Sequence, residues 1–189
     1  MKRAWYGAGM TRETRRFILG IAALWLASSA AHGAAALATV RNFDAVAYVG
    51  RWYQIALFPN RFQSQCIGET TADYHALPDS RLQVTNRCRT QEGYDQVVGV
   101  ARPHIDHPEN PAILQVRFAP AWLAALPFVW GDYWVIAAVG HYDAVLVGSP
   151  DRQYLWVLAR TRTISEAVYT TLTSVAAQQG FELQRLRRD

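Results

Sequence analysis

The sequence has little of what nucleic-acid binding would require. Its formal charge is +4 over 189 residues, but five of the 19 Lys and Arg residues lie before residue 39, against a single acidic residue there. Residues 39–189 therefore hold 14 Arg, no Lys and 14 Asp and Glu, a net charge of zero. A neutral domain lacks the positive patch that neutralises phosphates. We expect no nucleic-acid partner.

Catalytic and metal-binding motifs are equally scarce. The sequence has no glycine-rich phosphate loop and no HExxH, CxxC or GxSxG motif. His104 and His107 carry ligand-type nitrogens, but they lie in a proline-rich connection, so we expect no metal and no cofactor. The enzymatic alternative is a free, activated thiolate at Cys66. We expect no enzyme, because the second of the two cysteines, Cys88, offers a disulfide partner.

The first 38 residues resemble an export signal. A basic stretch ends at Arg15-Arg16, and the apolar run Phe17–Ala27 that follows is too short to span a bilayer. Cleavage is expected after Gly33 or after Ala38, with the second site favoured; an uncleaved membrane anchor is the alternative. The sequence thus predicts a signal peptide over 1–38 and one domain over 39–189. We expect this domain in the periplasm, where it could associate with the outer membrane. No cysteine precedes Cys66, so we expect no lipoprotein.

Short strand-like runs separated by turn residues dominate residues 50–160, a pattern typical of an all-β sandwich or barrel. Eight runs are expected, at 51–58, 66–76, 82–89, 96–101, 112–119, 133–139, 144–147 and 154–159. Alternation of apolar and polar residues in several of them predicts one buried face. Both cysteines fall on even positions of neighbouring runs, which makes a bridge geometrically reasonable.

One helix is expected near the end of the chain. Thr163-Ile-Ser-Glu166 fits a capping box, Val168, Leu172 and Val175 repeat at helical spacing, and Gly180 would end the helix. The alternating tail 181–186 could add a last strand.

Two motifs and their order along the chain resemble the lipocalin family. Gly50-Arg51-Trp52 opens the first run, and Arg160 ends the aromatic run before the helix. The Thr71–Tyr74 and Pro150–Thr161 segments extend the likeness to the bacterial lipocalin branch, the outer-membrane lipoprotein lipocalins, over residues 43–186. The resemblance implies an eight-stranded antiparallel up-and-down β-barrel with one C-terminal α-helix packed outside. It makes Gly50, Trp52 and Arg160 structural residues of the closed end, with Arg160 over the Trp52 ring.

A barrel of this kind implies a cavity for a small hydrophobic ligand. Inward parity predicts a lining of Ala56, Phe58, Ala72, Tyr74, Leu82, Val84, Asn86, Val116, Phe118, Tyr154 and Trp156. No inward Lys or Arg is obvious, so the expected ligand is an acyl lipid, either a fatty acid or a lysophospholipid. A tetrapyrrole or other planar aromatic is the alternative, with Trp156 and Phe118 as stacking surfaces. We expect a monomer or weak homodimer that transports or stores its ligand.

The connection 120–130 is uncharged and rich in aromatic residues. It carries Trp122, Leu123, Leu126, Phe128 and Trp130 and falls at the open end of the expected barrel. An apolar patch at a cavity mouth suggests a docking surface, and Trp and Tyr favour the membrane interface. Either this mouth loop contacts a membrane, or it folds inward and narrows the cavity.

Overall fold

The structure, a computed structural model, describes residues 36–189. The predicted signal peptide lies outside the described residues except for its last three, 36–38. Within residues 36–189, no helix combines the length and the apolar character needed to cross a membrane.

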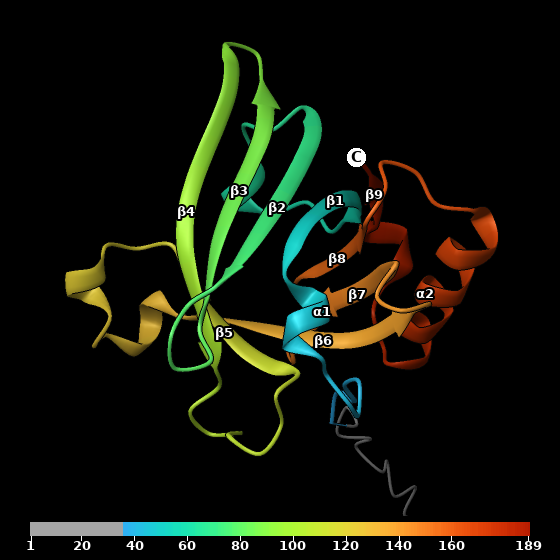
Figure 1. Ribbon diagram of the computed structural model, residues 1–189. Coiled ribbons are helices and arrows are strands. Elements are labelled where there is room, and N and C mark those ends of the chain that lie inside the picture. The colour runs from blue at the N-terminus through green and yellow to red at the C-terminus, as the bar shows by residue number, and fades with distance from the viewer. Residues whose placement is uncertain (1–35) are drawn as a thin grey trace, which may run out of the picture. The chain divides into compact units, whose positions relative to one another are not determined.

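The described residues form nine strands and two α-helices (Figure 1). In chain order these are α1 (Ala45–Tyr48), β1 (Gly50–Leu57), β2 (Gly68–Ala76), β3 (Leu82–Thr90), β4 (Gly93–Pro103), β5 (Ile113–Arg117), β6 (Gly131–Val139), β7 (Ala144–Gly148), β8 (Leu155–Ala159), α2 (Glu166–Gln178) and β9 (Arg187–Arg188). Short 3₁₀ turns occupy Arg61–Gln63, Ala121–Leu123, Pro127–Val129 and Leu183–Arg185.

The sheet closes on itself. Each strand from β2 to β8 pairs antiparallel with the next, and β1 pairs with both β8 and β2. The expected eight-stranded up-and-down barrel is therefore confirmed, and the eight expected runs correspond to β1–β8 within a few residues. The β3–β4 hairpin rises above the other strands (Figure 1).

The tail differs from the prediction of a strand over 181–186. Phe181 is buried with its ring centroid 6.2 Å from that of Phe58, and a 3₁₀ turn follows. Leu183 and Leu186 both pack against the same core, and a spacing of three residues suits a helical turn rather than a strand. The strand β9 forms only afterwards and pairs with the end of β1.

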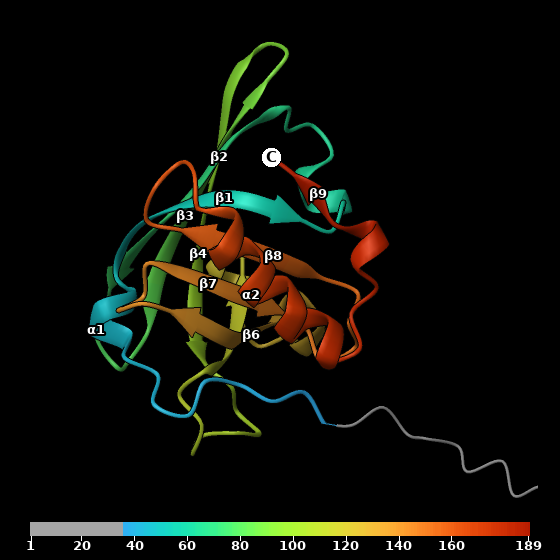
Figure 2. The ribbon, with the colours of Figure 1, turned by 90° about the vertical axis from the view of Figure 1, so that its right-hand side faces the viewer.

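The helix α2 covers one side of the barrel (Figure 2). Leu172 is fully buried there, and Val168 and Val175 pack beside it, as the helical spacing predicted. The capping prediction was two residues early: the N-cap is Ser165, whose hydroxyl accepts from the Val168 N–H at 3.3 Å. At Gly180 the backbone has a φ of +85°, so the expected helix end is confirmed.

Two hydrophobic cores result. One lies between the sheet and α2, and the other fills the closed end of the barrel. The second contains Tyr48, Trp52, Tyr74, Leu82, Val84, Ala101, Ala112, Val135, Tyr142, Val145, Val147 and Leu158. Trp52 is fully buried in it, and its indole N–H donates to the Tyr48 carbonyl at 2.9 Å.

Candidate ligand-binding site

Strand register places most of the predicted lining on the inner face. Ala72 pairs with both Trp52 and Asn86, and Asn86 pairs with Val97, so these four residues face the interior together. The other lining residues in the core of the closed end, or packed against it, are Tyr74, Leu82, Val84, Val116 and Trp156. Phe118 follows β5, and its ring lies where a side chain at Gly99 would point.

Exposure rises steeply from the closed end towards the mouth. Leu82 and Val84 are buried, whereas Val97 is 45% exposed and Phe118 is 36% exposed. An inward-facing side chain is accessible only when the space in front of it is not filled.

Val97 lies in the projecting β3–β4 hairpin, where Val98 on the other face is equally exposed. Within the barrel, however, inward-facing Ala72, Val116 and Trp156 are also only partly buried. The interior above the buried floor is therefore not completely filled.

Gly99 sets the position of Phe118. A Cβ at residue 99 would lie 2.6 Å from both the Phe118 ring and the Arg117 carbonyl oxygen. Because Gly99 has no side chain, the end of β5 can cross close to β4 and turn Phe118 into the interior. Phe118 thereby becomes part of the wall.

Two predicted lining residues lie elsewhere. The register of β1 against β8 shifts between Gln54 and Ala56. This irregularity moves Ala56 and Phe58 into the core beneath α2, where the Arg185 guanidinium lies 4.6 Å from the Phe58 ring centroid. The interpretation of Ala56 and Phe58 as cavity lining was wrong, because a β-bulge reverses the alternation on which it depended.

Three tyrosine hydroxyls form a cluster at the base of the interior, whereas the sequence indicated only Tyr74 there. The Tyr74 hydroxyl lies 2.8 Å from that of Tyr133, which lies 2.6 Å from that of Tyr48. Burial raises the pKa of Tyr74 to about 12, and it raises the pKa values of Tyr48 and Tyr133 well above 10. This tyrosine trio stays protonated at neutral pH. Sequence reasoning missed Tyr48 and Tyr133; only the inward parity of Tyr133 on β6 could have indicated one of them.

Aromatic rings line one side of the mouth. Tyr154 stacks on Trp156 with ring centroids 5.8 Å apart and planes within 5°, and Phe62 lies 5.8 Å from Tyr154. The Trp156 indole N–H donates to the Gln63 side-chain oxygen at 3.0 Å, and Gln63 in turn donates to Gln54 at 2.8 Å. These bonds tie the connection between β1 and β2 to the inner wall.

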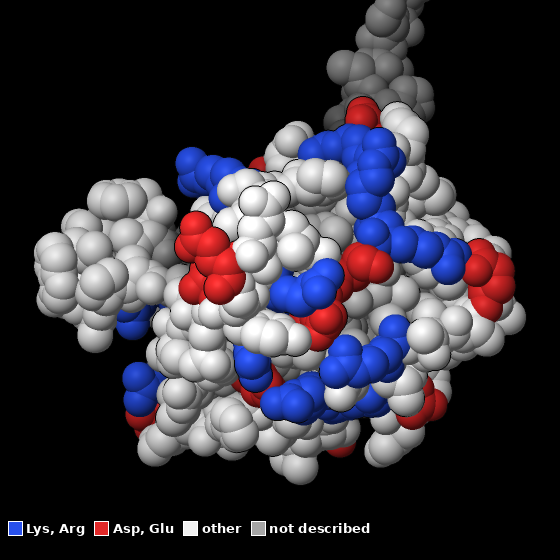
Figure 3. Space-filling model, turned by 90° about the horizontal axis from the view of Figure 1, so that it is seen from above, with Lys and Arg blue, Asp and Glu red and all other residues white. Residues whose placement is uncertain are grey.

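The mouth loop 120–130 turns outward. Trp130 anchors it from outside the barrel, because the guanidinium groups of Arg102 and Arg117 lie 3.7 and 5.2 Å from its ring centroid. Trp122 and Phe128 are each 80% exposed, so the alternative of an inward fold was wrong. Leu126 is also exposed, and Leu123 is half-buried. In Figure 3 the loop forms the lobe at the left, which shows almost no charged residues.

Comparison with known proteins decides the family. A family model described as a lipocalin-like domain matches residues 43–189. The chain belongs to the lipocalin family. It is 35% identical over 150 residues to temperature-induced lipocalin-1 of Arabidopsis thaliana, covering 79% of this chain and 80% of the relative. It is 36% identical over 151 residues to the outer membrane lipoprotein Blc of Escherichia coli, covering 77% and 78%.

Solved structures agree on the lipocalin fold. Insecticyanin from the tobacco hornworm Manduca sexta matches with a TM-score of 0.61 and 16% identity, over 81% of this chain and 83% of that one. Lobster apocrustacyanin A1 matches with a TM-score of 0.58 and 12% identity, over 76% and 77%. Lipocalins bind small hydrophobic ligands, which is consistent with a largely apolar, partly exposed inner face.

The expected disulfide of this lipocalin is confirmed. Cys66 and Cys88 are bonded, with their Cα atoms 5.6 Å apart, and the described residues include no free cysteine. The bridge joins the connection after β1 to β3. It also removes the thiolate on which the enzymatic alternative depended.

The two histidines considered as ligands have other contacts. His104 is buried, with Nε2 3.2 Å from an Asp132 carboxylate oxygen, and the His107 ring packs edge-on against Trp134. Within residues 36–189, no group of His, Cys, Asp or Glu side chains is arranged to hold a metal ion.

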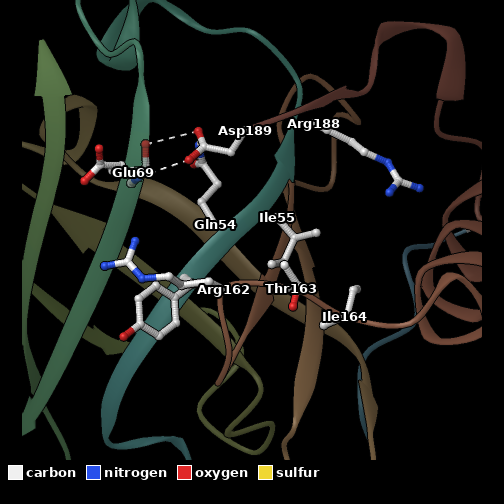
Figure 4. A pocket seen from close by; sticks show the side chains of 10 residues that line it. Gln54, Ile55, Glu69, Arg162, Thr163, Ile164, Arg188 and Asp189 are labelled. Atoms are coloured by element: carbon white, nitrogen blue, oxygen red, sulfur yellow. Dashed lines mark hydrogen bonds between the residues drawn. The ribbon is translucent and has the colours of Figure 1, made fainter.

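A separate pocket of about 340 Å³ lies where β2 diverges from β1 (Figure 4). Asp189 fills the gap between the two strands: its carboxylate accepts from Gln54 at 2.7 Å and from the Thr70 backbone N–H at 3.0 Å. Arg162 and Arg188 lie at opposite sides of this pocket (Figure 4). Because Gln54 also accepts from Gln63, the C-terminal strand is connected to the barrel mouth.

Proposed function

We propose that this lipocalin binds one single-chain lipid, a fatty acid or a lysophospholipid, inside its barrel and carries or stores it in the bacterial cell envelope without chemical change. The supporting observation is that inward-facing Ala72, Val116 and Trp156 remain partly exposed above a buried floor. Each methylene moved from water into such a space contributes about 0.8 kcal/mol. Chain burial would therefore dominate the affinity.

The charged head group of such a lipid would remain at the mouth. Arg102 and Arg117 face outward against Trp130, and the described inner wall contributes tyrosine, asparagine and glutamine rather than cations. An ionised carboxylate or phosphate held there without a partner would lose several kcal/mol of hydration energy. The chain would thus lie inside, with the head near Tyr154 and Phe62.

The test is native mass spectrometry of protein purified from the periplasm, followed by organic extraction and lipid analysis. We expect one acyl lipid per barrel, with the protein a monomer or weak homodimer. A barrel that is empty and also fails to bind palmitate and lysophosphatidylcholine in titrations would refute the proposal. The periplasmic location rests on the export-type leader and on the E. coli relative, which is named as an outer membrane lipoprotein.

We also propose that the mouth loop contacts the membrane surface during lipid exchange. Trp122 and Phe128 project from a loop without charged residues, and exposed aromatic side chains bind at membrane interfaces. The double variant Trp122→Ser/Phe128→Ser should lose most of its sedimentation with phosphatidylethanolamine–phosphatidylglycerol vesicles. Val46→Ser is the matched control, because Val46 is equally exposed but lies in α1, next to the closed end. Unchanged sedimentation of the double variant would refute the proposed contact between the mouth loop and the membrane.

A planar aromatic ligand is the second candidate. The parallel rings of Tyr154 and Trp156 provide a flat surface at the mouth, suited to offset stacking. Visible absorbance of the purified protein, retained on dialysis and removed by organic extraction, would favour this ligand over a lipid.

A further inference from the structure

The tyrosine trio has one more hydroxyl proton than it can use internally. Three hydroxyls carry three protons, and the trio contains two hydrogen bonds, Tyr48 to Tyr133 and Tyr133 to Tyr74. Each bond uses one proton, whichever oxygen donates. Among the described residues these hydroxyls have no further hydrogen-bond partner, so one O–H remains available in every arrangement.

The spare O–H belongs to Tyr133 when both Tyr48 and Tyr74 donate to it, and Tyr133 is the accessible member of the trio. Tyr48 and Tyr74 are buried, whereas Tyr133 is only half-buried. Tyr133 lies on β6 two residues before inward-facing Val135, so its exposed surface faces the interior. Ala72, two residues from Tyr74 on the same inner face, is itself only partly buried, so the inner surface next to the trio is accessible.

The trio suits an uncharged oxygen rather than an anion. The cation that acts on it electrostatically is Arg160, whose guanidinium already donates to the backbone carbonyls of Arg51, Ala47 and Val49. A carboxylate brought to this depth would lack a free counter-ion. A plain hydrocarbon chain would also fit poorly, because it would leave a buried O–H without an acceptor.

We propose that the tyrosine trio is a binding site for a hydroxyl or carbonyl oxygen carried along the ligand's acyl chain, so that the barrel selects oxygenated chains over saturated ones. This inference rests on the proposed function, since it assumes that an acyl chain enters the barrel. The head group stays at the mouth, and the chain oxygen accepts a hydrogen bond from the trio. Selection follows because a site with a buried donor discriminates against a ligand that lacks the acceptor.

The test compares dissociation constants for stearate, 10-hydroxystearate, 12-hydroxystearate and 12-oxostearate. We expect at least one oxygenated chain to bind about three- to tenfold more tightly than stearate, the range of one net hydrogen bond. The triple variant Tyr48→Phe/Tyr74→Phe/Tyr133→Phe removes the trio and leaves no unpaired hydroxyl. In this variant the dissociation constant of stearate divided by that of the oxygenated chain should fall to about one. Tyr94→Phe is the matched control, since Tyr94 is exposed on β4 and bonds to Glu69.

Infrared spectroscopy of carbonyl-labelled 12-oxostearate bound to the unmodified protein gives a second result that does not require the variant to fold. A hydrogen bond from the trio should lower the carbonyl stretching frequency relative to that in an alkane solvent. Equal affinities for all four chains with an unshifted carbonyl would overturn the inference and leave the carrier function intact. If none of the four chains binds, the inference fails, and titration with lysophosphatidylcholine then decides whether the proposed function fails with it.

Discussion

The guanidinium of Arg160 lies 3.8 Å from the centroid of the Trp52 ring, so the first residue after β8 covers the first aromatic residue of β1. Arg160 also donates to the Arg51 carbonyl at 2.9 Å and to the Val49 carbonyl at 3.1 Å. Its fork of donors thus bonds to backbone carbonyls at the end of α1 and the start of β1. The pair therefore stabilises the closed end of the barrel, which forms the floor of the proposed ligand space.

Replacing this arginine should destabilise the protein strongly. Arg160→Lys retains the charge but loses the planar stack and most of the carbonyl bonds. We expect the free energy of unfolding in urea to fall by about 2–4 kcal/mol. Arg162→Lys is the control, because the Arg162 guanidinium lies over an outer-face ring, 5.0 Å from the Tyr53 centroid. If Arg160→Lys lowers the free energy of unfolding by less than about 0.5 kcal/mol, the stabilising role of Arg160 is contradicted.

The disulfide should contribute stability at the mouth rather than reactivity. Its cysteines are 22 residues apart, and closing a loop of that length stabilises by about 3 kcal/mol through the unfolded chain. The Cys66→Ser/Cys88→Ser variant should lose about that much in urea unfolding. Thiol titration of unreduced, denatured protein should detect no free thiol. One reactive thiol per chain would instead support the hypothesis of an enzyme that uses a free Cys66 thiolate.

Strand alternation predicted the barrel well and its interior less well. The runs around Val84 and Leu114 alternate clearly, and both side chains are buried in the structure. The shift near Ala56 leaves no mark in the sequence, because a bulge adds one residue without changing composition. The run containing Val97 and Val98 has apolar residues at both parities, so its inner face could not be chosen from the sequence.

The functional polar groups were also partly hidden from sequence reasoning. Tyr48 and Tyr133 are 85 residues apart, and only closure of the barrel brings their hydroxyls together. The outward turn of the mouth loop likewise depends on Trp130 meeting two arginines from different strands. Such contacts are tertiary and leave no local signal.

Alkaline titration should report the buried trio. Tyr74 has a pKa raised from 10 to about 12 by burial, so the folded protein holds the phenolic proton more tightly than the unfolded chain does. The stability that this provides is complete below pH 10 and is lost as the pH rises from 10 towards 12. We expect the free energy of unfolding to fall by about 1.4 kcal/mol per pH unit for each tyrosine involved. Unfolding in urea at several pH values measures this slope.

The triple phenylalanine variant provides the comparison for this slope. Without the three hydroxyls, the steep loss between pH 10 and 12 should become markedly shallower, and the late-titrating phenolate absorbance should disappear. An identical slope in the variant would show that the loss comes from groups outside the trio.

The start of the mature chain can be predicted from contacts near the two candidate cleavage sites. Leu37 is buried in the core beneath α2, and Ala38 exchanges two hydrogen bonds with the Gln179 side chain, at 2.7 and 3.2 Å. Cleavage after Ala38 would remove all of these contacts, whereas cleavage after Gly33 would keep them. We therefore expect intact mass and N-terminal sequencing of the exported protein to give Ala34 as its first residue. A chain beginning at Thr39 should unfold with a free energy about 2–3 kcal/mol lower, mainly because the buried leucine is lost. An exported protein that begins at Thr39 and is as stable as the longer chain would show that the segment before it contributes nothing to the fold.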